Sequence, residues 1–328
     1  MQEFDPPLLL RNPHLMTIAS AFWHRRYVHL NRSVPRLFET EPGTQVRADC
    51  HWQQKPAEHP TLLLLHGLEG SSDSGYILGT ADKAFHAGFN VVRLNQRNCG
   101  GTEKLTPTLY NSGLSCDARA VVRELIERDC LLEIFATGFS MGGNLVLKMA
   151  GEFDDSVPRE LRCVVGICPS CDLGACADAI GELQNRIYER RFVKLLKARI
   201  LRKAALFPER YALNGLGNVR SVRQFDDAIT AKFCGFRDAD DYYAQSSALP
   251  LLGKIRVPTL LLVAQDDPMI PFRSFEAARL RENSQIQIEA PRYGGHCGFI
   301  AKKASGERFW AEARVVEFCR AHSRLAPL

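Results

Sequence analysis

The sequence predicts an α/β fold with a mostly parallel, doubly wound sheet. From about residue 60 onward, short apolar runs alternate with longer segments of helical periodicity, which is the pattern of parallel strands joined by crossover helices. Two of the runs, residues 61–65 and 259–264, are apolar after their first residue, as expected of strands that helices cover on both faces. Between residues 168 and 259 this alternation stops for about 90 residues.

The alternation predicts six strands and four helices. The strands are residues 61–65, 90–94, 132–137, 162–168, 259–264 and 285–289, and the helices are residues 76–87, 116–128, 141–151 and 272–282. Neither an internal repeat nor a low-complexity linker divides the chain. We therefore expect residues 1–328 to form a single domain.

Two segments lie outside the alternation. Residues 1–40 contain Pro6, Pro7, Pro13 and Pro35 and are expected to form an irregular N-terminal arm. The long interruption is mainly helical by pattern, and we expect residues 172–250 to form a cap. Because the insertion follows the carboxyl end of a strand, it would cover a site at that edge of the sheet.

The composition is that of an ordinary globular protein. Of 328 residues, 45% are apolar and 24% are charged, which excludes collagen-like, coiled-coil and wholly disordered chains. The net charge of +5 gives no argument for nucleic-acid binding. Eleven cysteines in so long a chain do not resemble a disulfide framework. With neither a signal-peptide pattern nor a run of about 20 apolar residues, we expect a cytoplasmic protein with free thiols.

The strongest functional signal is the sequence GFSMG at residues 138–142. It follows a predicted strand and precedes a predicted helix, the context in which a G-x-S-x-G sequence forms a sharp turn that exposes a nucleophilic serine. We therefore predict that Ser140 is the nucleophile. The alternative is a glycine-rich turn with a capping serine.

A serine hydroxyl needs a histidine base and a carboxylate that orients the base. In hydrolases built on this turn, the chain order is Ser, acid, His. Only His296 and His322 follow Ser140, and His296 lies between glycines after the last predicted strand, so we predict His296. Asp266 and Asp267 follow the penultimate strand, and we favour Asp267 as the acid. Asp266 would then be a turn former.

An oxyanion hole needs two backbone N–H donors. Met141, directly after the nucleophile, would supply one of them. The second should come from the loop after an early strand, where the sequence HGLEGSS begins at His66. We expect the amide of Leu68 to be this donor.

These motifs together resemble the YheT-like branch of the α/β-hydrolase superfamily. The resemblance covers nearly the whole chain and rests on NPHL (12–15), HGLEGSSDSGY (66–76), NQR (95–97), LYNSG (109–113), GFSMGGN (138–144), DDP (266–268) and GGH (294–296). It implies a Ser–Asp–His hydrolase with a helical cap that acts on esters or lipids, or that transfers medium-chain acyl groups to alcohols. Met16 and Asn98 depart from the residues usual in the family, Gln and Gly.

Three other signals are weaker. Cys168-Pro-Ser-Cys171 has CxxC form, but the spacing lacks the paired ligands of a zinc site, so we expect neither a metal nor another cofactor. Cys297 is an alternative nucleophile that no turn motif supports. Residues 186–203 carry eight basic side chains against one acidic one. They form either a solvated helix face or a weak contact with anionic membrane.

The sequence thus predicts a serine hydrolase that cleaves carboxylic esters through an acyl-enzyme. The substrate would be a small-molecule or lipid ester with a short- to medium-chain acyl group. Two alternatives remain open: an acyltransferase that uses an alcohol in place of water, and a non-catalytic protein that keeps the fold as a ligand pocket. The oligomeric state stays undetermined by the sequence.

Overall fold

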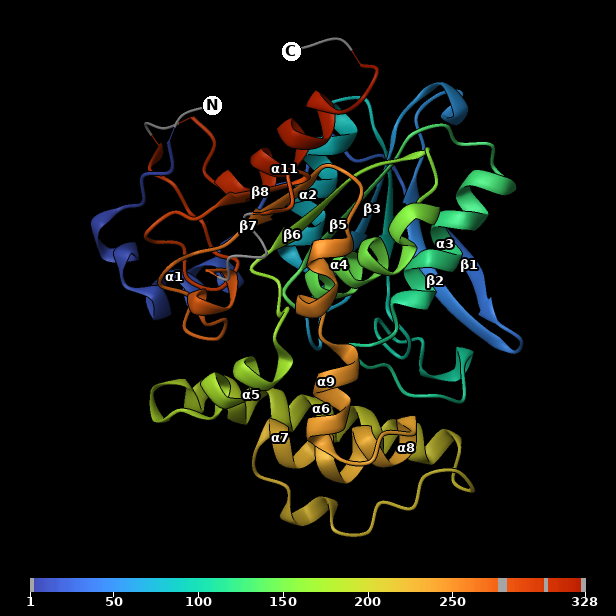
Figure 1. The fold of residues 1–328 in the computed structure, drawn as a ribbon, viewed down its shortest axis with the longest axis vertical. Coiled ribbons are helices and arrows are strands. Elements are labelled where there is room, and N and C mark those ends of the chain that lie inside the picture. The colour runs from blue at the N-terminus through green and yellow to red at the C-terminus, as the bar shows by residue number, and fades with distance from the viewer. Residues whose placement is uncertain (1–2, 277–281, 304–305, 326–328) are drawn as a thin grey trace.

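An eight-stranded sheet organises the chain, as Figure 1 shows. The computed structural model describes residues 3–276, 282–303 and 306–325. The strand order is β1-β2-β4-β3-β5-β6-β7-β8, and all neighbours from β4 to β8 are parallel. Only β1 and β2 run antiparallel to their neighbours. The predicted α/β class with a mostly parallel sheet is confirmed.

All six predicted strands are present, with ends that differ by no more than two residues. They are β3 (Thr61–Leu65), β4 (Asn90–Leu94), β5 (Ile134–Phe139), β6 (Leu161–Ile167), β7 (Thr259–Leu262) and β8 (Ile286–Glu289). Every residue of β3, β4, β5 and β7 is buried, because helices cover these strands on both faces.

Two strands at the edge of the sheet were not predicted. They are β1 (Val34–Glu41) and β2 (Thr44–His51), an antiparallel pair. Of the side chains in β1, only Phe38 is buried, so the strand lacks the continuous apolar run that marks the others. Residues 34–40 of the expected arm therefore belong to the sheet.

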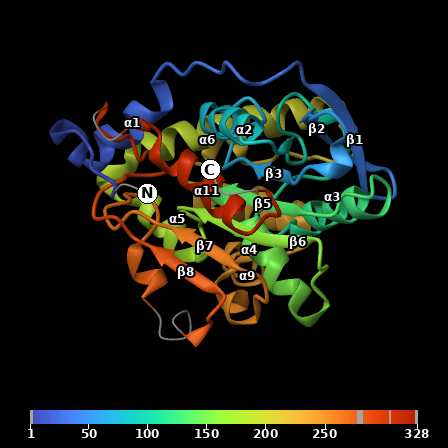
Figure 2. The ribbon, with the colours of Figure 1, turned by 90° about the horizontal axis from the view of Figure 1, so that it is seen from above.

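Helices pack on both faces of the sheet, as seen from above in Figure 2. The helices α2 (Gly75–His86) and α11 (Trp310–Ala321) lie together on one face, and α3 (Ser115–Glu127) and α4 (Met141–Phe153) lie on the other. The helices predicted at 76–87, 116–128 and 141–151 match α2, α3 and α4. Of the helix predicted at 272–282, a 3₁₀ turn at Phe272–Phe275 is present, and residues 277–281 lie outside the described residues.

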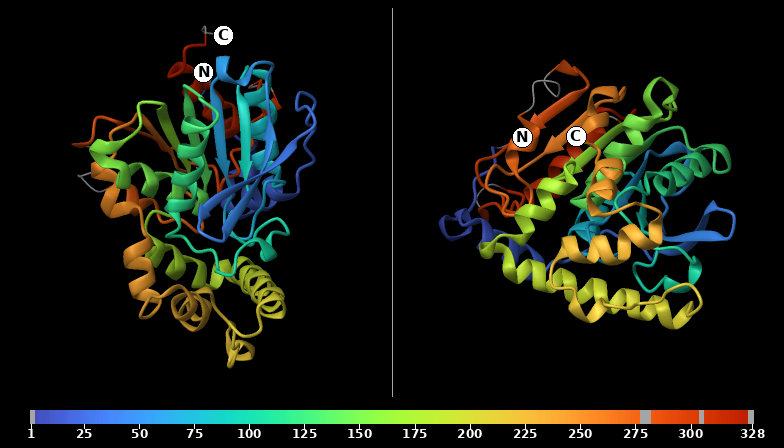
Figure 3. Two further views of the ribbon diagram at one scale, coloured as in Figure 1. Left: turned by 90° about the vertical axis from the view of Figure 1, so that its right-hand side faces the viewer. Right: turned by 60° about the horizontal axis from the view of Figure 1, so that its bottom comes forward.

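The segment between β6 and β7 is a helical insertion below the carboxyl ends of the strands (Figures 1 and 3). Its helices are α5 (Leu173–Gly181), α6 (Arg186–Leu206), α7 (Val222–Phe225), α8 (Lys232–Cys234) and α9 (Ala239–Ser246), with a π-helical turn at Asp226–Ala231 between α7 and α8. It has its own apolar cluster, which includes Val193, Ile200 and Phe225. In the part of the chain that the structure describes, none of the helices is long and apolar enough to span a bilayer.

The N-terminal segment also contains a helix, α1 (Pro13–Phe22), capped by the side chain of Asn12. Asn12 Oδ1 accepts hydrogen bonds from the backbone N–H groups of His14 and Leu15, each 3.0 Å long. Proline at the first helical position suits this start, because its missing N–H would be unpaired there. The helix reaches α6, where the rings of His14 and Tyr188 stack 5.8 Å apart.

Candidate active site

Ser140 occupies a strained turn between β5 and α4. Its backbone has φ 52° and ψ −117°, a conformation that costs free energy for any residue with a side chain. The flanking glycines permit the turn because there is no room for a methyl group. A Cβ on Gly138 would meet the carbonyl of Gly142, and a Cβ on Gly142 would lie 2.4 Å from the carbonyl oxygen of Leu65. The turn therefore packs directly against the end of β3.

His296 and Asp267 form a hydrogen-bonded pair. Nδ1 of His296 lies 2.9 Å from Oδ2 of Asp267, whose side chain is 1% exposed. The other oxygen of Asp267 accepts the backbone N–H groups of Met269 and Ile270 at 2.8 and 3.0 Å. These bonds fix the orientation of the carboxylate. The Nδ1–H of His296 donates to it, and the unprotonated Nε2 is then available as a base.

Asp266 points elsewhere. Its Oδ1 accepts the backbone N–H of Gly295 at 2.9 Å, and it therefore holds the loop that carries His296 rather than the imidazole. His322 lies just beyond α11, where its ring nitrogen bonds to the carbonyl of Phe318. Neither residue lines the cavity described below.

Helix α1 supports the histidine loop from outside the sheet. Thr17 Oγ1 accepts the backbone N–H of His296 at 2.9 Å. A Cβ on Gly295, which has φ 54°, would collide with the carbonyl of Pro13, so this position needs glycine. Met16 is fully buried, and its sulfur lies 3.3 Å from the backbone nitrogen of Ile300. The sequence did not predict that α1 supports the loop of His296, although the NPHL motif at residues 12–15 lies at the start of this helix.

The loop after β3 passes beside Ser140. The N–H of Gln96 donates to Nε2 of His66 at 3.2 Å, so His66 Nδ1 carries the proton and donates to the carbonyl of Gly67 at 2.8 Å. Burial and the nearby Arg199 lower the pKa of His66 to about 4, which keeps the ring neutral. A Cβ on Gly67 would lie 3.2 Å from Cβ of Ser140.

This contact brings the loop that carries the next residue, Leu68, close to Ser140. The N–H of Gly67 is already used, since it donates to the hydroxyl of Tyr76 at 3.0 Å. Leu68 and Met141 both line the cavity that contains Ser140. Met141 begins α4, and its N–H belongs to the first turn, where backbone donors have no partner within the helix.

A buried ion pair ties the same loop to the helical insertion. Glu69, at φ 58°, accepts two hydrogen bonds from Arg199 of α6, at 2.8 and 2.9 Å. Tyr110 donates a third at 2.5 Å. The two charged side chains are 4% and 8% exposed. Arg199 also donates to the carbonyl of Asn98, a residue at φ 64°.

Ser140 and His296 line one cavity that is partly open to solvent. Its walls are mainly apolar, and most come from the insertion. The apolar lining residues are Leu68, Met141, Leu173, Cys176, Ala177, Ile180, Phe192, Leu196, Val222, Met269 and Ile270. A second, smaller cavity shares Leu68, Met141, Leu196, Asp226 and Tyr242 with the first. The two cavities therefore adjoin at the loop beside Ser140.

The imidazole of His296 is electrostatically biased toward its charged form. Burial alone would lower the pKa of His296, but the carboxylate of Asp267, together with Cys297, outweighs burial and raises it well above the ordinary 6.5. Burial would likewise raise the pKa of the Cys297 thiol, but Cys168 and the imidazole lower it to about 6.

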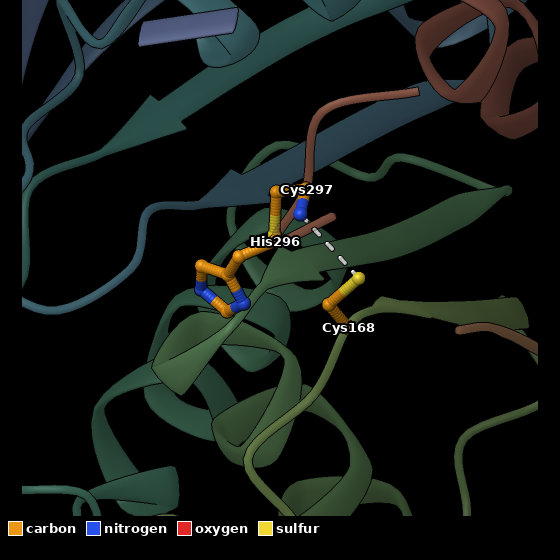
Figure 4. A group of neighbouring side chains, drawn as sticks. All are labelled: Cys168, His296 and Cys297. Carbon is orange, nitrogen blue, oxygen red and sulfur yellow. Dashed lines mark hydrogen bonds between the residues drawn. The ribbon is translucent and has the colours of Figure 1, made fainter. Parts of the chain in front are cut away.

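Cys168, His296 and Cys297 lie together, as Figure 4 shows. Their potential ligand atoms are within 4.8 Å of one another, and the N–H of Cys297 is bonded to the sulfur of Cys168 at 3.4 Å. A metal here would compete with the roles of the imidazole, whose Nδ1 is bonded to Asp267. Cys171, the other half of the CxxC sequence, is not part of this group. The group therefore belongs to the surroundings of His296.

The fold and the site together define the class of protein. The family model described as the alpha/beta hydrolase fold matches residues 60–301, and the chain belongs to this family. The chain is 33% identical over 321 residues to "Putative esterase YheT" of Escherichia coli (strain K12), covering 96% of this chain and 92% of that protein. The predicted YheT-like branch is confirmed.

Other relatives carry the names of lipid hydrolases. Phospholipase ABHD3 of Mus musculus is 28% identical over 80% of this chain and 66% of its own length, and the monoacylglycerol lipase of Saccharomyces cerevisiae is 28% identical over 77% and 57%. Among solved structures, the Pyrococcus furiosus esterase Pf2001 superimposes with a TM-score of 0.58 at 16% identity, with 98% of each chain covered. This likeness shows the fold alone. The relatives' names place the chain among carboxylic ester hydrolases.

Proposed function

We propose that the chain is a serine hydrolase that cleaves carboxylic esters through an acyl-enzyme on Ser140, His296 and Asp267. One observation carries this proposal: a histidine held at Nδ1 by a buried carboxylate lines the same cavity as a serine on a strained strand-to-helix turn. This is the arrangement that turns a serine hydroxyl into a nucleophile.

In the proposed reaction, Ser140 attacks the ester carbonyl while Nε2 of His296 takes its proton. Asp267 keeps the other ring nitrogen protonated and stabilises the imidazolium. The amides of Leu68 and Met141 donate to the oxyanion. His296 then returns the proton to the leaving alcohol, and water activated by the same imidazole releases the acid. No step calls for a metal or another cofactor.

We propose a short- to medium-chain acyl group, or a lipid-like one, as the part that the apolar walls accommodate. The helical insertion, residues 172–250 within a single domain, would then act as the cap that excludes water from the reacting ester. The names of the relatives, an esterase, a phospholipase and a monoacylglycerol lipase, agree with an ester substrate.

A chain-length series of p-nitrophenyl esters tests the substrate class. We expect kcat/KM to reach its maximum at an intermediate acyl length and the activity to disappear in Ser140→Ala. A maximum at acetyl, or efficient cleavage of a peptide, would contradict the proposal. Product analysis with water and a primary alcohol in competition separates hydrolysis from the acyltransferase alternative, because both use the same acyl-enzyme.

We also propose a weak, reversible contact with anionic membrane through residues 186–203. Arg186, Arg190 and Lys194 recur at helical spacing on α6 and are exposed, and Leu183 and Ile187 beside them are 80% and 72% exposed. Helix α1, which touches α6 through His14 and Tyr188, adds the exposed side chains of Leu15, Ile18 and Phe22. Basic and apolar side chains on one surface favour lipid interfaces.

We propose that the protein is located in the cytoplasm, because eleven cysteines in a long chain suit a reducing compartment.

A further inference from the structure

We propose that Asp226 is the acceptor of a hydroxyl-binding subsite, so that the enzyme favours esters whose alcohol part keeps a free hydroxyl group, as in a glycerol monoester. The inference rests on the proposed ester hydrolysis and adds the residue that selects the alcohol. Asp226 lines both adjoining cavities and is the only Asp or Glu among the described residues that line the cavity of Ser140.

The carboxylate is held in place from within the insertion. Its Oδ1 accepts the hydroxyl of Thr230 at 2.7 Å, and its Oδ2 accepts that of Tyr243 at 2.8 Å. Asp226 begins the π-helical turn Asp226–Ala231, a distortion that frequently occurs at functional sites. Each carboxylate oxygen has two lone pairs, so one acceptor position on each oxygen remains for a ligand. The residue also keeps part of its surface accessible although protein surrounds it.

Hydrogen-bond donors line the same cavity. Tyr242 accepts the N–H of Ser112 at 2.9 Å, which leaves its own hydroxyl proton to be donated. The hydroxyl oxygen of Ser170, a residue 7% exposed, has no partner among the described residues. A substrate hydroxyl both donates and accepts, so an acceptor such as Asp226 and donors such as these match it. An ester of a plain alcohol would leave these groups unpaired.

The guanidinium groups near Asp226 have other carboxylate partners. Arg199 lines the second cavity, and the guanidinium of Arg223 lies 5.1 Å from the ring of Tyr243, the partner of Asp226. Burial raises the pKa of Asp226 to about 6. Arg199 is paired with Glu69, and Arg223 with Asp178 and Asp240. Both guanidinium groups therefore already have carboxylate partners, and Asp226 can accept a hydrogen bond from a ligand hydroxyl.

The test compares two esters of one acid. With glycerol monodecanoate and methyl decanoate, we expect Asp226→Asn to lower kcat/KM for the glycerol ester about tenfold or more relative to the methyl ester, the scale of one charge-assisted hydrogen bond. A general loss of folded protein or of acylation lowers kcat/KM for both esters equally, so it does not change the ratio of the two values. Asp227→Asn, at the neighbouring exposed residue, is the matched control and should leave the ratio unchanged. Tyr243→Phe keeps the carboxylate and should retain most of the preference.

Other results would overturn the subsite. An equal loss on both esters, or no loss, would make Asp226 structural. A loss confined to choline decanoate would make the subsite cationic. A binding measurement does not depend on catalysis: in Ser140→Ala, the ether 1-O-decylglycerol should bind more weakly after Asp226→Asn, whereas decyl methyl ether should not. If the ether binds as expected while wild type hydrolyses no ester, the proposed reaction is wrong and the subsite stands.

Discussion

At the residue scale, the two adjacent aspartates after β7 have separate tasks. Asp267 bonds to the imidazole of His296, and Asp266 bonds to the backbone of the loop that carries it. We predict that Asp267→Asn lowers kcat about 10⁴-fold, as expected when the histidine loses its correct tautomer. Asp266→Asn should cost far less. Steady-state kinetics on a p-nitrophenyl ester measures both variants, and the reverse ranking would assign the acid to Asp266.

The carboxylate of Asp267 also affects how kcat/KM depends on pH. Because Asp267 raises the pKa of His296, the base is charged and inactive at low pH, and kcat/KM should rise as pH increases through a value above 6.5. Asp267→Asn removes the larger of the two causes and leaves Cys297, so the midpoint of the remaining activity should move to lower pH. A profile whose midpoint does not move in this variant would contradict the assignment.

The sequence predicted Ser140 from a local turn motif and His296 by elimination, and the structure brings both residues to one cavity. It could only favour Asp267, since two neighbouring carboxylates share the same motif and their side-chain directions depend on tertiary contacts. Thr17, Glu69 and Asp226 were not predicted for a similar reason. Each acts through partners that are more than ten residues away in the chain or that belong to an irregular turn.

At the scale of elements, α6 and the loop after β3 are joined by the pair of Arg199 and Glu69. If this pair positions the Leu68 amide, Arg199→Lys should lower kcat with little change in KM, because a bidentate site is not satisfied by an ammonium group. A displacement of about 1 Å costs on the order of 10²-fold. Stopped-flow acylation rates give the effect.

The control for this variant removes both charges. Arg199→Met with Glu69→Gln avoids the uncompensated buried carboxylate that would destabilise the single Arg199→Met variant by about 3–5 kcal/mol. The double variant should fold and still acylate slowly. Normal acylation in both variants would show that the pair contributes stability alone.

At the scale of the whole molecule, β3, β4, β5 and β7 were predictable because helices bury them on both faces, which favours mainly apolar runs. The antiparallel β1 and β2 were missed because both mix polar and apolar residues. β1 is largely exposed, and β2 carries Asp49 and His51 among its buried side chains. The contact of α1 with the histidine loop and with α6 also escaped prediction. It joins residues that lie more than 170 positions apart.

The surface formed by α6 and α1 has a measurable consequence. Each basic residue near an anionic surface contributes about 1 kcal/mol, and Arg186, Arg190, Arg191 and Lys194 are exposed, so we expect roughly 4 kcal/mol. Arg199 and Lys203 are buried and do not contribute. We predict cosedimentation with anionic vesicles, little with neutral ones, and release at high salt because the charges are screened.

A matched pair of triple variants controls this prediction. Replacing Arg190, Arg191 and Lys194 by Glu should abolish binding, whereas the same change at the exposed Arg123, Arg128 and Arg159, outside the insertion, should not. Hydrolysis of a soluble ester should survive in both. Equal binding to both kinds of vesicle, or to neither, would identify the basic residues of α6 as a solvated helix face.

The central claim, that Ser140 is an activated nucleophile, is tested most directly by covalent labelling. A fluorophosphonate probe should react with the folded wild type, and peptide mass spectrometry should find the adduct on Ser140. Ser140→Ala should remain unlabelled, and His296→Ala should react far more slowly because the base is gone. A folded wild type that stays unlabelled would contradict the account. Labelling that persists in Ser140→Ala would also contradict it and would direct attention to Cys297.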